Sequence, residues 1–268
     1  MAYETLKTEL DSRGVLHVTL SRPEIKNAFN EVMIKELTDV FTQTVKDPNV
    51  RVVVLSGAGD IFCAGGDLNW MKRSVSLPYS ENIKDTKVLT EMFATMNECP
   101  KPLIGVVRGA AIGGGVGLVS VCDLVLATED TQFSLSEVRL GIVPACIGPF
   151  VVAKIGATHS RRFFISAERF FASKAKEIGL VHEVYKDASS LNEALSKLLS
   201  TMVQCGPHAV AVAKRLVLDL SWPERRAQQP DCLDYVAKTL AEIRTTPEGQ
   251  EGVTAFLEKR KPSWLKEG

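Results

Sequence analysis

The glycine-rich segment near the middle of the chain is its most informative part: Arg108-Gly109-Ala110-Ala111-Ile112-Gly113-Gly114-Gly115-Val116-Gly117. It follows the apolar run 103–107, which is typical of a buried strand, and it leads into an apolar helical stretch. Glycines at the start of a helix leave backbone N–H groups unpaired, and without Cβ atoms they let a ligand lie against the backbone. Because the helix dipole also favours negative charge there, the segment predicts a site for an anion or an oxyanion.

A second glycine-bearing loop, Phe62-Cys63-Ala64-Gly65-Gly66-Asp67-Leu68, follows another apolar run, 52–56. In a parallel sheet both loops would leave the carboxyl ends of their strands at the same edge, where they could converge. The alternative is that both loops only turn the chain tightly, and composition alone favours neither interpretation.

The glycine spacing does not fit the common nucleotide-binding motifs. A GxGxxG pattern read from Gly113 would need a glycine at Leu118, and the chain contains no P-loop lysine motif, no GxSxG elbow and no HExxH pair. The four histidines lie far apart in the sequence, so we expect no metal site.

Strand-like and helix-like segments alternate in the first part of the chain. Strands are expected at 15–20, 52–56, 103–107 and 124–127, and helices at about 30–45, where Asn30 could cap the helix, and 80–97. This alternation predicts an α/β layer architecture. Helical periodicity dominates after about Pro149, so we divide the chain into an α/β core, 1–200, and a helical C-terminal region, 201–268.

The charges of the 268-residue chain balance, because 32 Lys and Arg residues face 32 Asp and Glu residues. We therefore expect no nucleic-acid partner. Every apolar stretch is interrupted within 18 residues, so no membrane partner is expected. The six cysteines occur singly, without a CxxC pair, which predicts reduced thiols and a cytoplasmic location.

Several blocks of this sequence resemble, in order and spacing, the enoyl-coenzyme A hydratase/isomerase (crotonase) superfamily. They are 61–68, 108–115, Cys122-Asp123 and 133–144, and the likeness extends from 22–30 to 251–260. The resemblance implies a crotonase-like spiral of repeated ββα units, followed by a helical trimerisation region. It also implies a homotrimer, commonly paired into a hexamer, and an acyl-coenzyme A thioester as substrate.

The resemblance also implies roles for individual residues. The family's oxyanion hole falls on the backbone N–H groups of Gly66 and Gly114. Substrate and coenzyme A contacts fall on Arg22, Lys26, Ala28, Ala64, Asp67, Leu68 and Gly117, and on Phe256 and Lys259, which would reach a neighbouring subunit's ligand. No cofactor is implied besides the coenzyme A of the substrate. A solvated basic tail is the alternative for Lys259, and the segment 70–77 could be a lid or a surface helix.

The family's two catalytic glutamates are only half present. The second falls on Glu137, which we expect to act as general acid/base, whereas the first falls on Gly117, 20 positions earlier. Apolar neighbours, namely Val138, Leu140 and Ile142, could raise the pKa of Glu137. The alternative is a solvated carboxylate, or one paired with Arg139.

Three activities remain open with a single glutamate: hydration of an α,β-unsaturated thioester, isomerisation of a 3-enoyl to a 2-enoyl thioester, and binding without turnover. The blocks 113–120, 135–141 and 144–152 resemble bacterial methylglutaconyl-coenzyme A hydratases of leucine degradation. Gly117 would leave room for a branched acyl chain. It would also remove a carboxylate whose repulsion of an acidic substrate is about 1–4 kcal/mol at close range.

Overall fold

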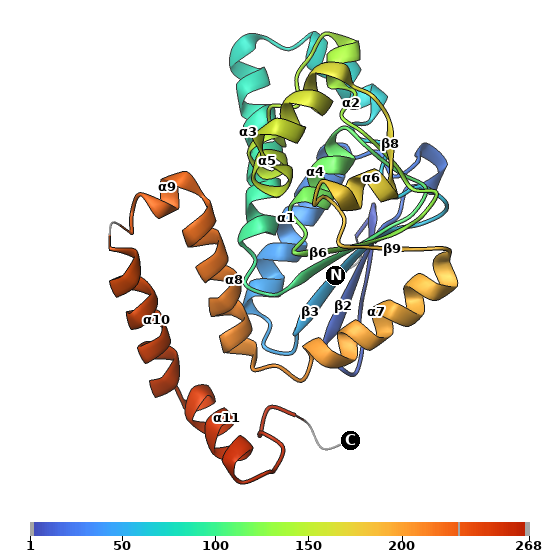
Figure 1. Ribbon diagram of the computed structural model, residues 1–268. Coiled ribbons are helices and arrows are strands. Elements are labelled where there is room, and N and C mark those ends of the chain that lie inside the picture. The colour runs from blue at the N-terminus through green and yellow to red at the C-terminus, as the bar shows by residue number, and fades with distance from the viewer. Residues whose placement is uncertain (1–2, 230, 266–268) are drawn as a thin grey trace.

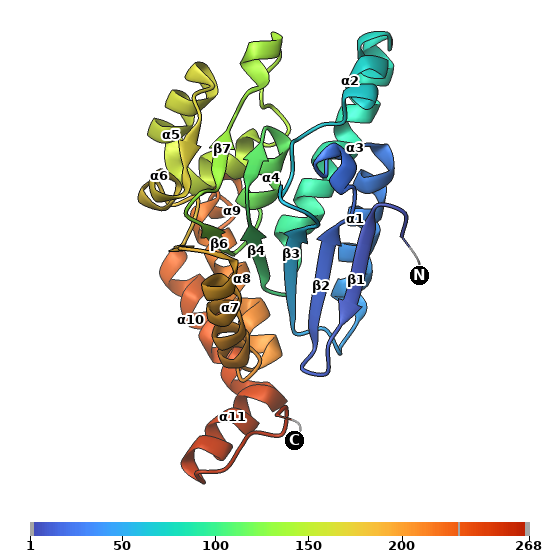
Figure 2. The same ribbon diagram turned by 90° about the vertical axis from the view of Figure 1, so that its right-hand side faces the viewer.

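A computed structural model describes residues 3–229 and 231–265. Six strands form the main sheet in the order β1-β2-β3-β4-β6-β9. Figure 2 shows β1, β2, β3, β4 and β6 side by side in this order. Their bounds are Leu6–Leu10, Val15–Leu20, Val52–Gly57, Leu103–Val107, Leu124–Thr128 and Glu183–Tyr185. Only β1 is antiparallel to its neighbour. The four strands expected from the sequence are all present, and β1 and β9 are additional.

A smaller sheet carries the second strand of each repeat. It contains β5 (Ala110–Ile112), β7 (Gln132–Ser134) and β8 (Phe170–Phe171). Strand β5 follows β4 after two residues, and β7 follows β6 after three, so each of these two repeats adds one strand to each sheet. The turn from β4 to β5 needs glycine at position 109. Gly109 has φ +69°, and a Cβ there would overlap the carbonyl oxygen of Asp60.

The helices of the core follow the same repeats. They are α1 (Glu31–Lys46), α2 (Leu68–Val75), α3 (Tyr79–Glu98), α4 (Gly114–Ser120), α5 (Gly148–Ser166), α6 (Ala172–Glu177) and α7 (Ala188–Met202), with the 3-10 helices η1 (Pro23–Ile25) and η2 (Glu137–Leu140). Asn30 caps α1 as expected, since its side chain accepts a hydrogen bond from the Met33 N–H at 3.1 Å. The predicted helices 30–45 and 80–97 therefore correspond to α1 and α3.

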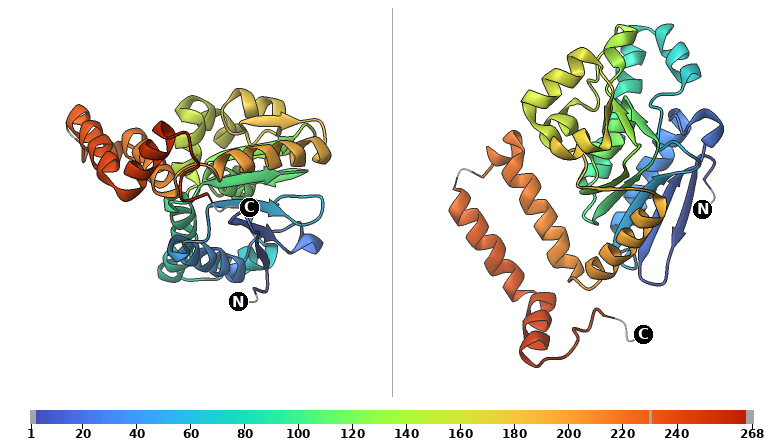
Figure 3. Two further views of the ribbon diagram at one scale, coloured as in Figure 1. Left: turned by 90° about the horizontal axis from the view of Figure 1, so that it is seen from below. Right: turned by 45° about the vertical axis from the view of Figure 1, so that its right-hand side comes forward.

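Helices cover both faces of the main sheet, as the two further views in Figure 3 show. On one face α1, α3, α4 and α5 bury the larger apolar cluster, which includes Phe41, Phe93 and Leu55. On the other face Leu191 and Leu199 of α7 pack against apolar side chains of the strands. Strands buried on both faces explain the continuous apolar runs in the sequence. Helix α7 ends at Met202, and the division that we placed at residue 200 stays a prediction.

The C-terminal region is helical, as expected. Its helices are α8 (Pro207–Ser221), α9 (Pro223–Arg226), α10 (Cys232–Thr245) and α11 (Pro247–Leu257). Helix α8 lies along the core, whereas α10 and α11 extend away from it (Figure 1). Glu248 connects α11 to the start of α8, because its carboxylate accepts hydrogen bonds from the N–H groups of His208 at 2.9 Å and Ala209 at 2.8 Å. Among the described residues, no helix combines the length and the apolar character that crossing a membrane requires.

Candidate active site

The two glycine loops meet at a cavity of about 630 Å³. Gly65 and Gly66 line it from one loop and Gly113 and Gly114 from the other, and Glu137 lines it from η2. The loops are joined by a parallel bridge between Cys63 and Ala111. The convergence that we expected from two parallel strands is therefore present, and the loops do more than turn the chain.

Two backbone N–H groups at this junction lack a partner. The Phe29 N–H donates to Gly65 O at 2.9 Å, and Phe29 O accepts from the Asp67 N–H at 2.9 Å. The backbone on both sides of Gly66 is therefore hydrogen-bonded to Phe29. Neither the Gly66 nor the Gly114 N–H donates a hydrogen bond within the described part of the chain. Gly114 is the first residue of α4, where N–H groups have no acceptor in the helix. Two free donors can therefore point at one oxygen atom.

Glycine is required at Gly114 by the ring of Phe29. A Cβ on Gly114 would lie 2.6 Å from Phe29 Cε1 and still closer to Cζ. Phe29 in turn packs edge-on against Phe93, with ring centroids 6.5 Å apart. The aromatic core thus holds the start of α4 in place.

Glu137 is a half-buried carboxyl at the same junction. Its Oε1 lies 3.2 Å from the position that a Cβ on Gly113 would take. Its Oε2 is buried and has no hydrogen-bond partner among the described residues. Burial raises the pKa of Glu137 above its ordinary value, as the apolar neighbours led us to expect. A carboxyl of this kind holds its proton to higher pH and can exchange it with a carbon acid.

The alternative pairing of Glu137 with Arg139 does not form. The guanidinium of Arg139 donates to Ala167 O at 2.8 Å instead. Of the three apolar neighbours that we named, Leu140 and Ile142 line the cavity and Val138 does not.

Gly117 lies outside the cavity, which corrects one sequence-based expectation. It is buried in α4, and a Cβ there would lie 2.9 Å from Ile147 Cβ and 3.0 Å from Phe93 Cε1. The room that we expected for a branched acyl chain is filled by these two side chains. A glutamate would not fit at this position without moving the wall of the cavity.

The segment expected to bind coenzyme A is assembled beside the cavity. Arg22 donates to Ala28 O at 2.7 Å and pairs with Asp67 at 3.0 Å. Burial by itself would raise the pKa of Asp67, but hydrogen bonds from the N–H groups that it caps on α2 and from Arg22 hold that pKa below its ordinary range. Lys26 is exposed and its carbonyl accepts the Ala64 N–H at 3.0 Å.

Ala64 and Leu68 line the cavity, and the Leu68 side chain is 80% exposed. The two segments 22–28 and 64–68 are thus adjacent in space. Their contacts with coenzyme A stay predictions.

Asn27 organises this segment and was not singled out from the sequence. It is fully buried with φ +54°, and its Nδ2 donates to Ala58 O at 2.8 Å and Ile61 O at 2.7 Å. Its Oδ1 accepts the Arg22 N–H at 2.9 Å. Asparagine is among the few residues other than glycine that adopt positive φ readily, which is the only signal that the sequence offers.

The segment 70–77 includes most of helix α2, which is exposed on one side and lines the cavity on the other. Trp70 and Met71 face Gly66, because a Cβ on Gly66 would lie 3.4 Å from Trp70 Cζ3 and 3.5 Å from Met71 Sδ. Cys146 lines the opposite wall, and burial raises the pKa of its thiol. Phe256 belongs to α11 and Lys259 follows that helix; neither lines the cavity, and Phe256 is 82% exposed. Figure 1 shows α11 far from α2 and α3, which line the cavity.

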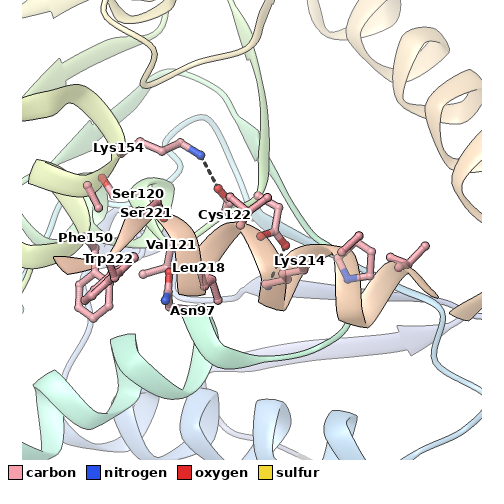
Figure 4. A pocket seen from close by; sticks show the side chains of 16 residues that line it. Asn97, Ser120, Val121, Cys122, Phe150, Lys154, Lys214, Leu218, Ser221 and Trp222 are labelled. Atoms are coloured by element: carbon pink, nitrogen blue, oxygen red, sulfur yellow. Dashed lines mark hydrogen bonds and ion pairs between the residues drawn. The ribbon is translucent and has the colours of Figure 1, made fainter. Parts of the chain in front are cut away.

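A second cavity, of about 470 Å³, lies between α8 and the core (Figure 4). Its two lysines already have partners. Lys154 donates to Cys122 O at 2.6 Å, and Lys214 pairs with Asp123 at 2.8 Å. Burial lowers the pKa of Lys154. The polar groups here attach α8 and α5 to the core and leave no charged group free for chemistry.

The comparisons with known proteins agree with this geometry. The sequence profile of the enoyl-CoA hydratase/isomerase family matches residues 11–267. Enoyl-CoA hydratase AKT6-1 of Alternaria alternata is 31% identical over 254 residues, which cover 94% of this chain and 81% of that protein. The mitochondrial Delta(3,5)-Delta(2,4)-dienoyl-CoA isomerase of Mus musculus is 32% identical over 271 residues, which cover 96% and 81%.

The crystal structure of an enoyl-CoA hydratase from Shewanella pealeana superposes with a TM-score of 0.91 at 35% identity, covering 97% of this chain and 96% of that one. This likeness confirms the predicted crotonase-like fold. Sequence, fold and cavity lead to one conclusion: the chain belongs to the enoyl-CoA hydratase/isomerase family.

Proposed function

We propose that this enzyme adds water to an α,β-unsaturated enoyl-coenzyme A thioester. The observation that carries the proposal is the unpaired, buried carboxyl of Glu137 beside two unpaired N–H groups, those of Gly66 and Gly114. The thioester oxygen would accept both N–H groups. As water attacks C3, the C2–C3 π electrons move toward the thioester and charge grows on that oxygen, where each donor contributes about 3 kcal/mol.

Glu137 completes the addition in this scheme. Glu137 donates a proton to C2 and is left as a carboxylate, and the proton that the attacking water loses passes to a base or to solvent. Burial, which raises the pKa of Glu137, favours the protonated form that this step needs. The reaction then needs no cofactor besides the coenzyme A of the substrate. Arg22 and Lys26 lie on the side of the cavity where coenzyme A would be bound, and they would supply local positive charge on a chain of zero net charge.

The proposed acyl group is 3-methylglutaconyl, an intermediate of leucine degradation. Because the space beside Gly117 is filled, Gly117 no longer supports this acyl group. The support comes instead from a lysine of α2. Lys72 lines the cavity and could pair with the substrate's own carboxylate. Lys72→Met should therefore raise KM for 3-methylglutaconyl-coenzyme A several-fold and leave KM for crotonyl-coenzyme A unchanged.

The proposed assembly is a homotrimer or a pair of trimers, in the cytoplasm. Leu233 of α10 and Phe256 and Leu257 of α11 are more than 70% exposed, at 80%, 82% and 73%. Such apolar side chains on helices that extend from the core favour contact with a neighbouring subunit. All six cysteines are free thiols, which suits a reducing compartment.

The test is loss of the conjugated-thioester absorbance with crotonyl- and 3-methylglutaconyl-coenzyme A. Glu137→Gln should lower kcat about 1,000-fold, within the range for removal of a general acid. Glu129→Gln, at an exposed position outside the cavity, is the matched control. Turnover by Glu137→Gln at the wild-type rate would exclude the assigned role.

Isomerisation of a 3-enoyl to a 2-enoyl thioester is the second candidate. One carboxylate can move one proton between C2 and C4, and position 117 lacks the family's other glutamate. Conjugation that appears from a 3-enoyl thioester, without hydration of the 2-enoyl product, would favour this activity. A protein that binds the thioesters and turns over neither would be a binding protein.

A further inference from the structure

Asp85 of α3 lines the same cavity as Glu137. It lies four and eight positions before Leu89 and Phe93, so the three side chains share one face of the helix. All three line the cavity. Phe93 packs against Gly117, where the cavity ends. Asp85 lies two turns earlier on the same helix, nearer to its start at Tyr79.

Trp70 links Asp85 to the unpaired N–H of Gly66. One edge of its indole lies 3.4 Å from the Cβ position of Gly66, and its Nε1 donates toward Asp85 Oδ1 at 3.4 Å. The ring is held from behind by Phe29, with centroids 6.0 Å apart. Asp85 is therefore positioned relative to the thioester oxygen by a packed aromatic side chain.

The charge of Asp85 is directed toward the cavity. It takes part in no ion pair among the described residues. Close to the same helix, the pKa of the Cys146 thiol is raised first by burial and also by the negative charge of Asp85, while a hydrogen bond with Thr90 of α3 lowers it. Asp85 and Cys146 therefore line neighbouring parts of one cavity.

Asp85 and Glu137 are the two carboxylates that line this cavity. The remaining ionisable groups there are the Cys146 thiol, which burial keeps protonated, and Lys72, a cation on the exposed side of α2. The space that the side chain of the family's first glutamate would need, beside Gly117, is filled by Ile147 and Phe93.

We propose that Asp85 is the second catalytic carboxylate, the general base that activates water; this inference rests on the proposed hydration. Asp85 accepts a proton from water as the water oxygen bonds to C3. The C2–C3 π electrons shift toward the thioester oxygen, and the resulting enolate takes the proton of Glu137 at C2. The product gains one water, Asp85 ends protonated and Glu137 ionised, and proton exchange with solvent restores both.

The experiment separates attack by water from proton exchange at C2. Hydration of crotonyl-coenzyme A is measured beside exchange of the C2 protons of butyryl-coenzyme A in D₂O, which needs Glu137 and the two N–H groups but no attacking water. Asp85→Asn should lower hydration kcat about 100-fold and leave exchange within threefold of wild type. Glu137→Gln should lower both rates. Glu91→Gln, an exposed acid on the same helix outside the cavity, should change neither.

Each other outcome has a distinct meaning. Hydration by Asp85→Asn within threefold of wild type overturns the role of Asp85 and leaves the proposed hydratase standing. An equal loss of hydration and exchange in Asp85→Asn overturns it as well, because the whole cavity would then have been disturbed. Exchange without hydration in the wild-type protein overturns both the proposed function and this inference.

Discussion

The two ends of helix α4 differ in how their polar groups are satisfied. At the first residue, the N–H of Gly114 and the nearby Oε2 of Glu137 have no partner among the described residues. Beyond the last residue, Lys154 donates to Cys122 O at 2.6 Å, and Asp123 accepts from Lys214 and from the Leu103 N–H, both at 2.8 Å. Cations at the C-terminal end of a helix also complement its dipole.

This contrast distinguishes a reactive cavity from a structural one better than size does. The cavities at the two ends have similar volumes, about 630 and 470 Å³. A buried polar group without a partner costs about 1–3 kcal/mol, so it persists where a ligand completes it. The unpaired groups at the start of α4 therefore support the proposed location of the active site.

The largest effect is expected between the two ends, at Gly117. Gly117→Glu restores the family's glutamate but places its charge against the apolar side chains of Ile147 and Phe93. We expect a loss of about 4 kcal/mol in the free energy of unfolding, measured by urea denaturation. Adding Ile147→Ala should return part of that loss. A Gly117→Glu protein as stable as wild type would contradict the packing described for α4.

Gly114→Ala probes the reactive end. The new methyl group would overlap the ring of Phe29 and displace the N–H donor. We expect kcat/KM for the enoyl thioester to fall about 100-fold, as when an oxyanion-hole donor is removed. Gly148→Ala is the matched control at the first residue of α5, because its methyl group would lie at an ordinary 3.9 Å from Phe164. Unchanged kcat/KM in folded Gly114→Ala would place the donor elsewhere.

Lys154→Met probes the structural end. Loss of the amine leaves Cys122 O unpaired, so the free energy of unfolding should fall by about 1–2 kcal/mol. The kcat/KM of the folded protein should stay within twofold of wild type. Lys197→Met, which breaks a fully exposed pair with Glu193 on α7, should leave the free energy of unfolding almost unchanged, because solvent screens such pairs. A selective loss of kcat in Lys154→Met would contradict the assignment of a purely structural role to the cavity at the end of α4.

The smallest effect is the pH dependence of stability at Glu137. Its pKa is raised in the folded protein, so ionisation opposes folding, and the stability present below the unfolded pKa is lost as pH rises through the folded pKa. Glu137→Gln should therefore raise Tm at pH 7.5 by about 2 °C, and the difference should shrink at pH 4. A larger gain at pH 4 than at pH 7.5 would mean that the carboxylate is stabilised in the fold.

The parts of the fold that the sequence predicts are those with a local signal. Apolar, β-branched runs such as 52–56 identify strands buried on both faces, and Asn30 identifies the start of α1. The strands β5, β7 and β8 have three, three and two residues, too few to show a period. They were therefore not anticipated, although they form the second sheet of the repeat.

The candidate site divides in the same way. Glycine loops after buried strands predict the unpaired N–H groups, and the family's spacing indicates Glu137. Contacts between residues far apart in the sequence leave no such signal. The side chain of Ile147 fills the space beside Gly117, 30 positions away, and Trp70 reaches Asp85 across two helices. Only the folded chain shows that one expected space is closed and that a second carboxylate lines the same cavity as Glu137.

Asp67 has a mechanical consequence for substrate choice. It follows Gly66 in the chain, caps α2 through the Asn69 N–H at 2.7 Å and is anchored by Arg22 at 3.0 Å. Helix α2 is also a wall of the cavity. In the proposed reaction, an acyl chain that pushed this wall outward would turn the peptide that presents the Gly66 N–H. Acyl length would then be sensed at the thioester oxygen, and an ill-fitting chain would lower turnover more than binding.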